Sequence, residues 1–231
     1  MPSKQTSPAK LSHDRLRLSA KLVAVIAPFM AKGDPRSYLN AINVRPHPDG
    51  GAVIAATNGY IMGVVHDQLA VCEHEVTLQL HTGIVAACRM HHNDVRELVM
   101  FKGRLAVVHG EKEVCIQAGV PVVSDGEFPR YELIIPSADR LKPGLHGPFQ
   151  ARFIALLQEA IKALKSPVHP DPINFFHVAG EPRSVGVART AMLKEFVAIL
   201  MPAADLSPID SVPSWVRTAQ RAACTPAKAA A

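Results

Sequence analysis

The sequence predicts an α+β protein in which a helix followed by three strands occurs three times. Apolar residues repeat at helical spacing in three stretches, short alternating or apolar runs follow each stretch, and turns containing Gly, Pro or Asn separate the runs. The 231 residues are 48% apolar and 19% charged, which is typical of a folded chain and excludes wholesale disorder. A chain of this length forms one large domain or two small ones without a covalent staple.

The first unit begins with a helix whose apolar side chains run from Leu18 to Met30. Gly33-Asp34-Pro35 ends this helix. Asn58-Gly59 is typical of a two-residue hairpin turn, because both residues tolerate positive φ. Strands are predicted around this turn and before it, at 38–44, 52–57 and 61–66.

The same order recurs in the rest of the chain, in units of roughly 60 residues. The second unit is predicted to have a strand at 75–81, a helix at 82–91 and strands at 95–101, 104–109 and 113–118. The third has a strong helical stripe from Phe149 to Leu164, followed by strands at 173–178, 184–188 and 196–201. We expect a disordered tail at 1–10, and at 205–231 a short helix (214–217) with a mobile, alanine-rich end.

The net charge of +5 is concentrated on the predicted helices. In the first 36 residues, seven basic residues face only Asp14 and Asp34, whereas the strand-rich middle is close to neutral. Basic side chains along helices attract nucleic-acid phosphates by releasing counterions. A solvated helix face that never meets DNA explains the same pattern.

Several other functions are disfavoured by the sequence. No apolar run approaches the ~20 residues of a membrane span, and no secretory signal is evident, so we expect a cytoplasmic protein. The four scattered cysteines form no C-x-x-C pair, and His91, His92 and Asp94 are badly spaced for chelation, so we expect neither metal nor cofactor. No phosphate loop or catalytic motif is present, and we expect no enzyme activity.

Four stretches, in order, resemble the bacterial sliding clamp family, the β subunit of DNA polymerase III. Residues 36–41 (RSYLNA) are similar to R-Y-Y-L-N-G, and residues 56–62 (ATNGYIM) to A-T-D-G-H-R-L. Residues 125–136 (DGEFPRYELIIP) resemble D-G-x-F-P-D-Y-x-x-V-x-P, and residues 197–202 (VAILMP) resemble the final strand, which ends Y-V-V-M-P-M-R. The resemblance implies a DNA-clamp-like fold of β-α-β-β-β half-units.

The resemblance covers one and a half clamp domains. Residues 11–137 look like one full domain of two half-units, and 148–204 look like half of the next domain. A standard clamp subunit has six half-units, whereas this chain has three. We expect a shortened relative, of the kind that a phage or mobile element encodes.

In the family, a pocket built from these four stretches captures a short apolar peptide of a polymerase or another partner. The resemblance implies that the same pocket is lined here by Leu39, Thr57, Gly59, Tyr60, Ile61, Met62, Pro129, Leu133, Ile134, Ile199, Leu200, Met201 and Pro202. Flexible methionines and branched aliphatic residues suit an apolar anchor. The same residues also fit a purely structural role in the core and turns. Tyr60-Ile61 replaces the family's His-Arg and Ala203-Ala204 its final Met-Arg, so we expect a more apolar rim and an altered or lost preference.

The resemblance also implies a ring whose helices hold double-stranded DNA without sequence specificity. The candidate phosphate contacts on the basic helices are Arg15, Arg17, Lys21, Arg152, Lys162 and Lys165. The leading hypothesis is a sliding-clamp-like processivity or scaffold protein that recruits polymerase and forms a homo-oligomer, with four copies supplying the family's twelve half-units. The alternative is a monomeric peptide-binding adaptor or decoy that competes with the host clamp.

Overall fold

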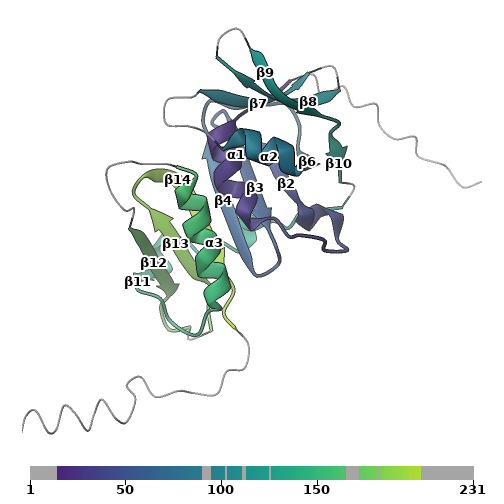
Figure 1. The fold of residues 1–231 in the computed structure, drawn as a ribbon. Coiled ribbons are helices and arrows are strands. Elements are labelled where there is room, and N and C mark those ends of the chain that lie inside the picture. Colours follow the sequence, from purple (N-terminus) through teal and green to yellow (C-terminus); the bar gives the residue numbers. More distant parts are fainter. Residues whose placement is uncertain are drawn as a thin grey trace, which may run out of the picture.

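The three predicted units are present in the structure, a computed structural model that describes residues 15–89, 95–101, 103–110, 113–124, 126–164, 172–181 and 183–203 (Figure 1). The first unit contains β1 (Leu16–Ser19), α1 (Ala20–Ile26), β2 (Ala41–Pro46), β3 (Ala52–Thr57) and β4 (Ile61–Asp67). Two 3-10 helices connect α1 to β2: η1 (Ala27–Phe29) and η2 (Ser37–Asn40).

The second and third units repeat this β-α-β-β-β order. The second contains β6 (Val76–Gln79), α2 (Thr82–Cys88), β7 (Arg96–Phe101), β8 (Arg104–His109) and β9 (Val114–Gly119). The third contains β11 (Leu141–Pro143), α3 (Ala151–Lys162), β12 (Ile173–Val178), β13 (Gly186–Thr190) and β14 (Leu193–Leu200). Between units lie β5 (Val71–Cys72), β10 (Val122–Val123), η3 (Tyr131–Leu133) and η4 (Ala138–Arg140). The predicted fold class is confirmed.

All strand pairs are antiparallel, and they form two sheets. The smaller sheet has the order β5-β1-β7-β8-β9, and the larger has the order β10-β6-β2-β3-β4-β14-β13-β12-β11. In the larger sheet β4 pairs with β14, from Val65 opposite Phe196 to Ile61 opposite Leu200. This one pairing joins the first and third units into a continuous sheet of nine strands.

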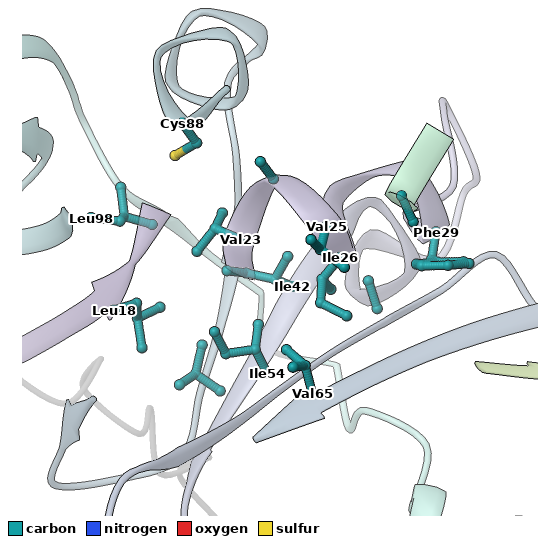
Figure 2. Packing of buried hydrophobic residues seen from close by; sticks show 14 of the residues in the cluster. Leu18, Val23, Val25, Ile26, Phe29, Ile42, Ile54, Val65, Cys88 and Leu98 are labelled. Atoms are coloured by element: carbon teal, nitrogen blue, oxygen red, sulfur yellow. The ribbon is translucent and has the colours of Figure 1, made fainter. Parts of the chain in front are cut away.

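The helices share one main core with the inner faces of the sheets. Helix α1 packs against both α2 and α3, and its residues Val23, Val25 and Ile26 are fully buried. Figure 2 shows Val23 and Ile26 beside Ile42 and Ile54 of the larger sheet. Because α1 is only seven residues long, tertiary packing of its apolar side chains rather than intrinsic propensity stabilises it.

A row of small residues admits an aromatic side chain at the junction of the units. Ala56 of β3, Gly63 of β4 and Ala198 of β14 lie opposite one another across three strands. The ring of Phe29 lies over this row and is 6.0 Å, between centroids, from that of Phe196. The backbone of Gly63 is therefore approached closely by Phe29, in the way that interior strand glycines often permit.

Several predicted boundaries differ from the structure. The strands predicted at 184–188 and 196–201 are β13 (Gly186–Thr190) and β14 (Leu193–Leu200), and the helices predicted at 82–91 and 149–164 are shorter. Two further differences change the type of element. The stretch from Leu18 is helical only from Ala20, because residues 16–19 pair with β7 and alternate in burial as a strand does. The strand predicted at 38–44 begins only at Ala41, since residues 37–40 form η2 and bury Leu39. The tail at 1–10 and the short helix at 214–217 lie outside the described residues.

Replacing Gly63 by alanine should lower the free energy of unfolding by about 2 kcal/mol, the usual cost of overpacking. A Cβ at this position would lie 2.3 Å from Cδ2 of Phe29, so the ring must move. Urea unfolding measures the change. Gly83→Ala is the control: its Cβ has only ordinary contacts in α2, so stability should hold or rise by up to about 1 kcal/mol. Equal losses in both variants would contradict this packing.

Candidate functional site

A pocket of about 210 Å³ opens where the paired strands β4 and β14 meet. It is bounded by the β3–β4 turn, η2, the end of β14 and the segment around η3. The lining residues are Arg36, Tyr38, Leu39, Thr57, Gly59, Tyr60, Ile61, Met62, Pro129, Ile134, Ile199 and Met201. Most of this lining is apolar, which suits the capture of a large apolar side chain.

The β3–β4 turn that forms one wall is fixed by side-chain hydrogen bonds. The hydroxyl of Thr57 donates to the carbonyl of Ile61 (2.9 Å) and accepts from the N–H of Gly59 (3.0 Å). Asn58 Oδ1 accepts from the N–H groups of Tyr60 and Ile61 (3.0 and 3.1 Å). Gly59 has φ +87°, a conformation that other residues rarely adopt. The two central residues of the hairpin are therefore Gly59 and Tyr60, one position later than predicted.

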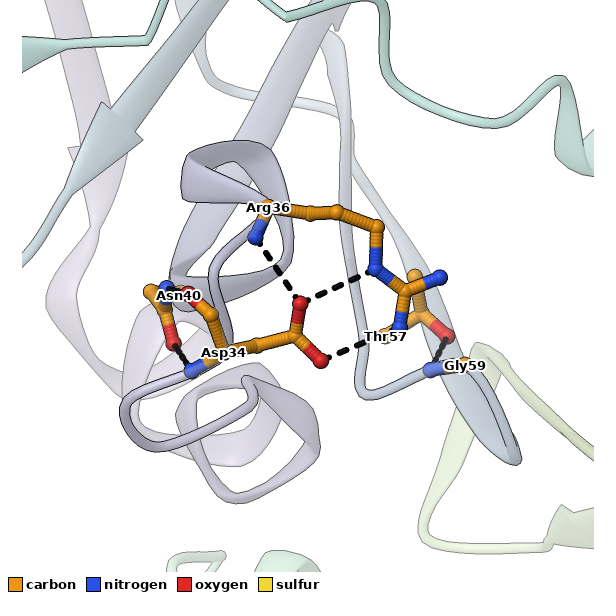
Figure 3. A network of polar contacts seen from close by, with 5 residues as sticks. All are labelled: Asp34, Arg36, Asn40, Thr57 and Gly59. Carbon is orange, nitrogen blue, oxygen red and sulfur yellow. Dashed lines mark hydrogen bonds and ion pairs between the residues drawn. The ribbon is translucent and has the colours of Figure 1, made fainter.

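An arginine–carboxylate pair stands at the rim of the pocket, beside this turn (Figure 3). Nε and Nη2 of Arg36 donate to the two oxygens of Asp34 (2.9 and 3.0 Å), and the backbone N–H of Arg36 donates to Oδ1 (2.9 Å). Asn40 holds the loop by accepting from the N–H of Asp34. These bonds from Arg36 lower the pKa of Asp34 to about 2.

The opposite wall comes from the end of β14. The N–H of Met201 donates to the carbonyl of Tyr60 (2.8 Å), which extends the β4–β14 ladder into the turn. Met62 and Ile199 are opposite each other in this ladder and share a face of the sheet. That face is covered by Phe128 and Tyr131, which hold Pro129 and Ile134 next to the pocket.

Ten of the thirteen residues predicted for the pocket lie around it. Leu200 does not, because it follows Ile199 on a strand and therefore points to the opposite face, into the main core. Leu133 is 83% exposed in η3 and borders a separate hollow beside Glu132, while Pro202 lies beyond the lining. Arg36 and Tyr38 were missed although they belong to the first family-like stretch. Arg36, which matches the arginine that opens the first family-like stretch, places a cation at the rim, while Tyr60 and Ile61 stand where the family has His-Arg.

A second, larger hollow of about 520 Å³ adjoins the pocket on the side of α3. Tyr60 lines both hollows, and 53% of this residue is exposed. Its ring stacks on that of Phe153 in α3, with centroids 5.4 Å apart and an interplanar angle of 17°. The guanidinium of Arg152 lies 4.8 Å from the Phe153 centroid and 5.8 Å from that of Tyr60.

The predicted phosphate contacts divide between strand and helices. Arg15 precedes β1 and Arg17 lies in it, so the prediction that both are helical is wrong. Arg15 pairs with Glu73 (3.7 Å), and Arg17 pairs with Glu97 and Glu113, so neighbouring carboxylates offset part of the charge of both arginines. Lys21 lies on α1, and Arg152 and Lys162 lie on α3; Lys165 is outside the described residues.

One further cation joins the helix layer. Arg89 follows α2. The hydrogen bond from Lys162 and the charge of Lys162 lower the pKa of Glu159, and the charge of Arg89 adds a smaller contribution in the same direction. Glu159 is the only acidic residue within α1, α2 and α3, which also carry Lys21, Arg152 and Lys162. The helix predicted at 82–91 included Arg89, but its place near Glu159 depends on how α2 and α3 are positioned in the fold, so it was not among the predicted phosphate contacts.

Two other features are absent from the described part of the chain. No helix there is long and apolar enough to cross a bilayer. No group of three His, Cys, Asp or Glu side chains there is arranged to hold a metal ion. The histidines at 91 and 92 lie outside the described residues.

The geometry matches solved structures of bacterial sliding clamps. The DNA polymerase sliding clamp from Pseudomonas aeruginosa is similar with a TM-score of 0.59 and 15% identity, over 88% of this chain and 70% of that one. The DNA polymerase III subunit beta from Bartonella birtlesii, bound to griselimycin, is similar with a TM-score of 0.58 and 16% identity, over 89% of this chain and 69% of that one. Caulobacter crescentus pol III beta has a TM-score of 0.57 and 15% identity, over 89% of this chain and 70% of that one.

This chain has the sliding-clamp fold. No protein-family model matches it, and no curated protein does. The similarity therefore lies in the order and pairing of the elements, with few identical residues. The clamp-like fold expected from the four short stretches is confirmed.

Titration of the Asp34 carboxyl should show a midpoint near pH 2 in the folded protein, against an ordinary value of 3.8. Because the folded-state pKa is lowered, the pair with Arg36 persists through mildly acidic pH and is lost as pH falls through 2. Carbon-13 NMR of the side-chain carboxyl measures this midpoint. Arg36→Gln should return it toward 3.8, and an unchanged midpoint in that variant would contradict the assigned cause.

Proposed function

We propose that this chain is a clamp-like, DNA-associated scaffold that recruits a polymerase or another partner through an apolar anchor. The observation that carries the proposal is the pocket at the β4–β14 junction, in a chain with the sliding-clamp fold. Four separate parts of the sequence supply its walls, and hydrogen bonds or core packing hold them in place. We assign no catalytic step to the chain.

The chemistry of the pocket favours a short apolar segment over a polar small molecule. Ile134, Ile199, Met62 and Met201 supply adaptable aliphatic surface, and methionine in particular conforms to differently shaped ligands. The backbone of the β3–β4 turn is already ordered by Thr57 and Asn58, so little ordering entropy is lost when a ligand binds there.

The helix layer supports a contact with duplex DNA. Lys21, Arg89 and Lys162 are exposed on or beside the helices, and Glu159 is the only acid within them. Such a surface neutralises phosphates without reading bases, which suits a protein that moves along DNA.

The adaptor alternative uses the same pocket without DNA. It is favoured by the ion pairs of Arg15, Arg17 and Lys162 with nearby glutamates, which partly neutralise three cations of the predicted phosphate-binding set. Molar mass by light scattering at micromolar concentration separates the two. A tetramer supports a ring, and a monomer supports the adaptor.

Met201→Asp should weaken the binding of an apolar peptide at least about tenfold, because it places a charge in an apolar pocket. The probe is a fluorescein-labelled peptide with a Leu-Phe anchor, measured by anisotropy; griselimycin, the ligand of two of the clamp structures, is a second probe.

Met192→Asp is the matched control. Met192 lies in the β13–β14 turn and is 41% exposed, compared with 39% for Met201, but it is absent from the pocket lining. Its variant should bind both probes like the parent protein. Unchanged binding by Met201→Asp, or an equal loss in both variants, would refute the assignment of the pocket.

Removing Lys21, Arg89 and Lys162 together by alanine substitution should weaken duplex DNA binding and flatten its salt dependence. The slope of log K against log salt should fall in magnitude by about 2 to 3, since each phosphate that the protein no longer neutralises reduces it by about 0.9. The slope is obtained from the fluorescence anisotropy of a labelled duplex of about 20 base pairs. The salt concentration is varied from about 25 to about 200 mM, a range in which electrostatic binding stays measurable.

The charge-matched control removes Lys142, Arg183 and Lys194, which are exposed outside the helices. Its slope should stay close to that of the parent protein. A similar loss of slope in both triple variants would show that net charge, and not the helix layer, determines binding.

A further inference from the structure

The two hollows beside the β3–β4 turn share Tyr60 as a lining residue. The smaller is the apolar pocket, and the larger continues toward η1 and the first turn of α3. The backbone of Tyr60 is fixed on both sides, by Asn58 and by Met201, while its ring stacks on Phe153. A segment that leaves the pocket past Tyr60 therefore enters the larger hollow directly.

The larger hollow carries a net positive charge. Lys32 and Arg152 line it, and Arg152 is held in place over the rings of Phe153 and Tyr60. Asp34 also lines it, but both of its carboxylate oxygens are bound by Arg36. The charge of Asp34 is therefore balanced inside the wall and leaves the two other cations uncompensated.

The start of α3 adds to this positive potential. Arg152 lies in the first turn of this twelve-residue helix, where the helix dipole already places partial positive charge. No acidic residue occupies the first turn, and the N-cap residue Gln150 makes no capping side-chain bond. Pro28, Met30 and Leu156 supply the apolar part of the lining.

We propose that the partner segment carries acidic side chains next to its apolar anchor and that Lys32 and Arg152 bind them in the larger hollow. This rests on the proposed function, because the anchor occupies the pocket. A carboxylate on a short aliphatic stem matches both the two cations and the apolar lining. Arg152, predicted from the sequence as a DNA contact, is thereby assigned to the partner peptide.

The experiment compares two fluorescein-labelled peptides that share a Leu-Phe anchor. In one the anchor is flanked on both sides by aspartates, and in the other by asparagines, so that charge is the main difference. Affinities are measured by anisotropy at low salt for the parent chain, for Lys32→Ala/Arg152→Ala, and for the charge-matched control Lys142→Ala/Lys194→Ala.

The parent chain should bind the aspartate peptide about fivefold more tightly, as expected for two partly exposed ion pairs. Lys32→Ala/Arg152→Ala should lose this preference and still bind the asparagine peptide like the parent, which shows that the pocket is intact. The control variant should keep the preference.

Four results overturn the inference. Equal affinity of the parent chain for both peptides refutes the acidic flank and leaves the pocket standing. A similar loss of preference in the control variant assigns the effect to net charge. An unchanged preference in Lys32→Ala/Arg152→Ala, with weaker binding of duplex DNA, assigns these cations to phosphate. If the parent chain binds neither peptide, the proposed function fails as well.

Discussion

The pairing of β4 with β14 is the interaction on which the rest of the structure depends. It joins the first and third units into one sheet, and it places the β3–β4 turn beside the end of β14. Close approach there requires small residues, because Ala56, Gly63 and Ala198 leave room for Phe29. The pocket and the larger hollow both open at this junction, so fold and site have the same physical origin.

Much of the fold could be predicted from local pattern. β3 and β8 were predicted with the bounds that the structure gives, since Gly- or Asn-containing turns flank short apolar runs. The first strand was missed because Leu18 also fits the helical stripe that runs to Met30, and only pairing with β7 makes residues 16–19 extended. The two-residue strands β5 and β10 are too short for any periodicity and exist only through their partners.

The site was predicted less completely, for reasons that a single sequence does not resolve. Residues on the β3–β4 turn are close in sequence and in space, so one family-like stretch already grouped those that line the pocket. Leu200 was included with Ile199 although alternation sends it to the core. The ion pairs of Arg17 and the position of Arg89 depend on contacts between distant segments. Charge counting along the chain therefore overestimated the cations of β1 and missed one beside α2.

The most direct test of the central claim is the NMR spectrum of methionine methyl groups during titration with the Leu-Phe peptide. Met62 and Met201 line the pocket, Met30 lines only the larger hollow, and Met192 lies in a distant turn. The account predicts large, saturable shifts at Met62 and Met201 and none at Met192. Saturable shifts at Met192, or none at Met62 and Met201 under conditions where the peptide binds, would contradict it.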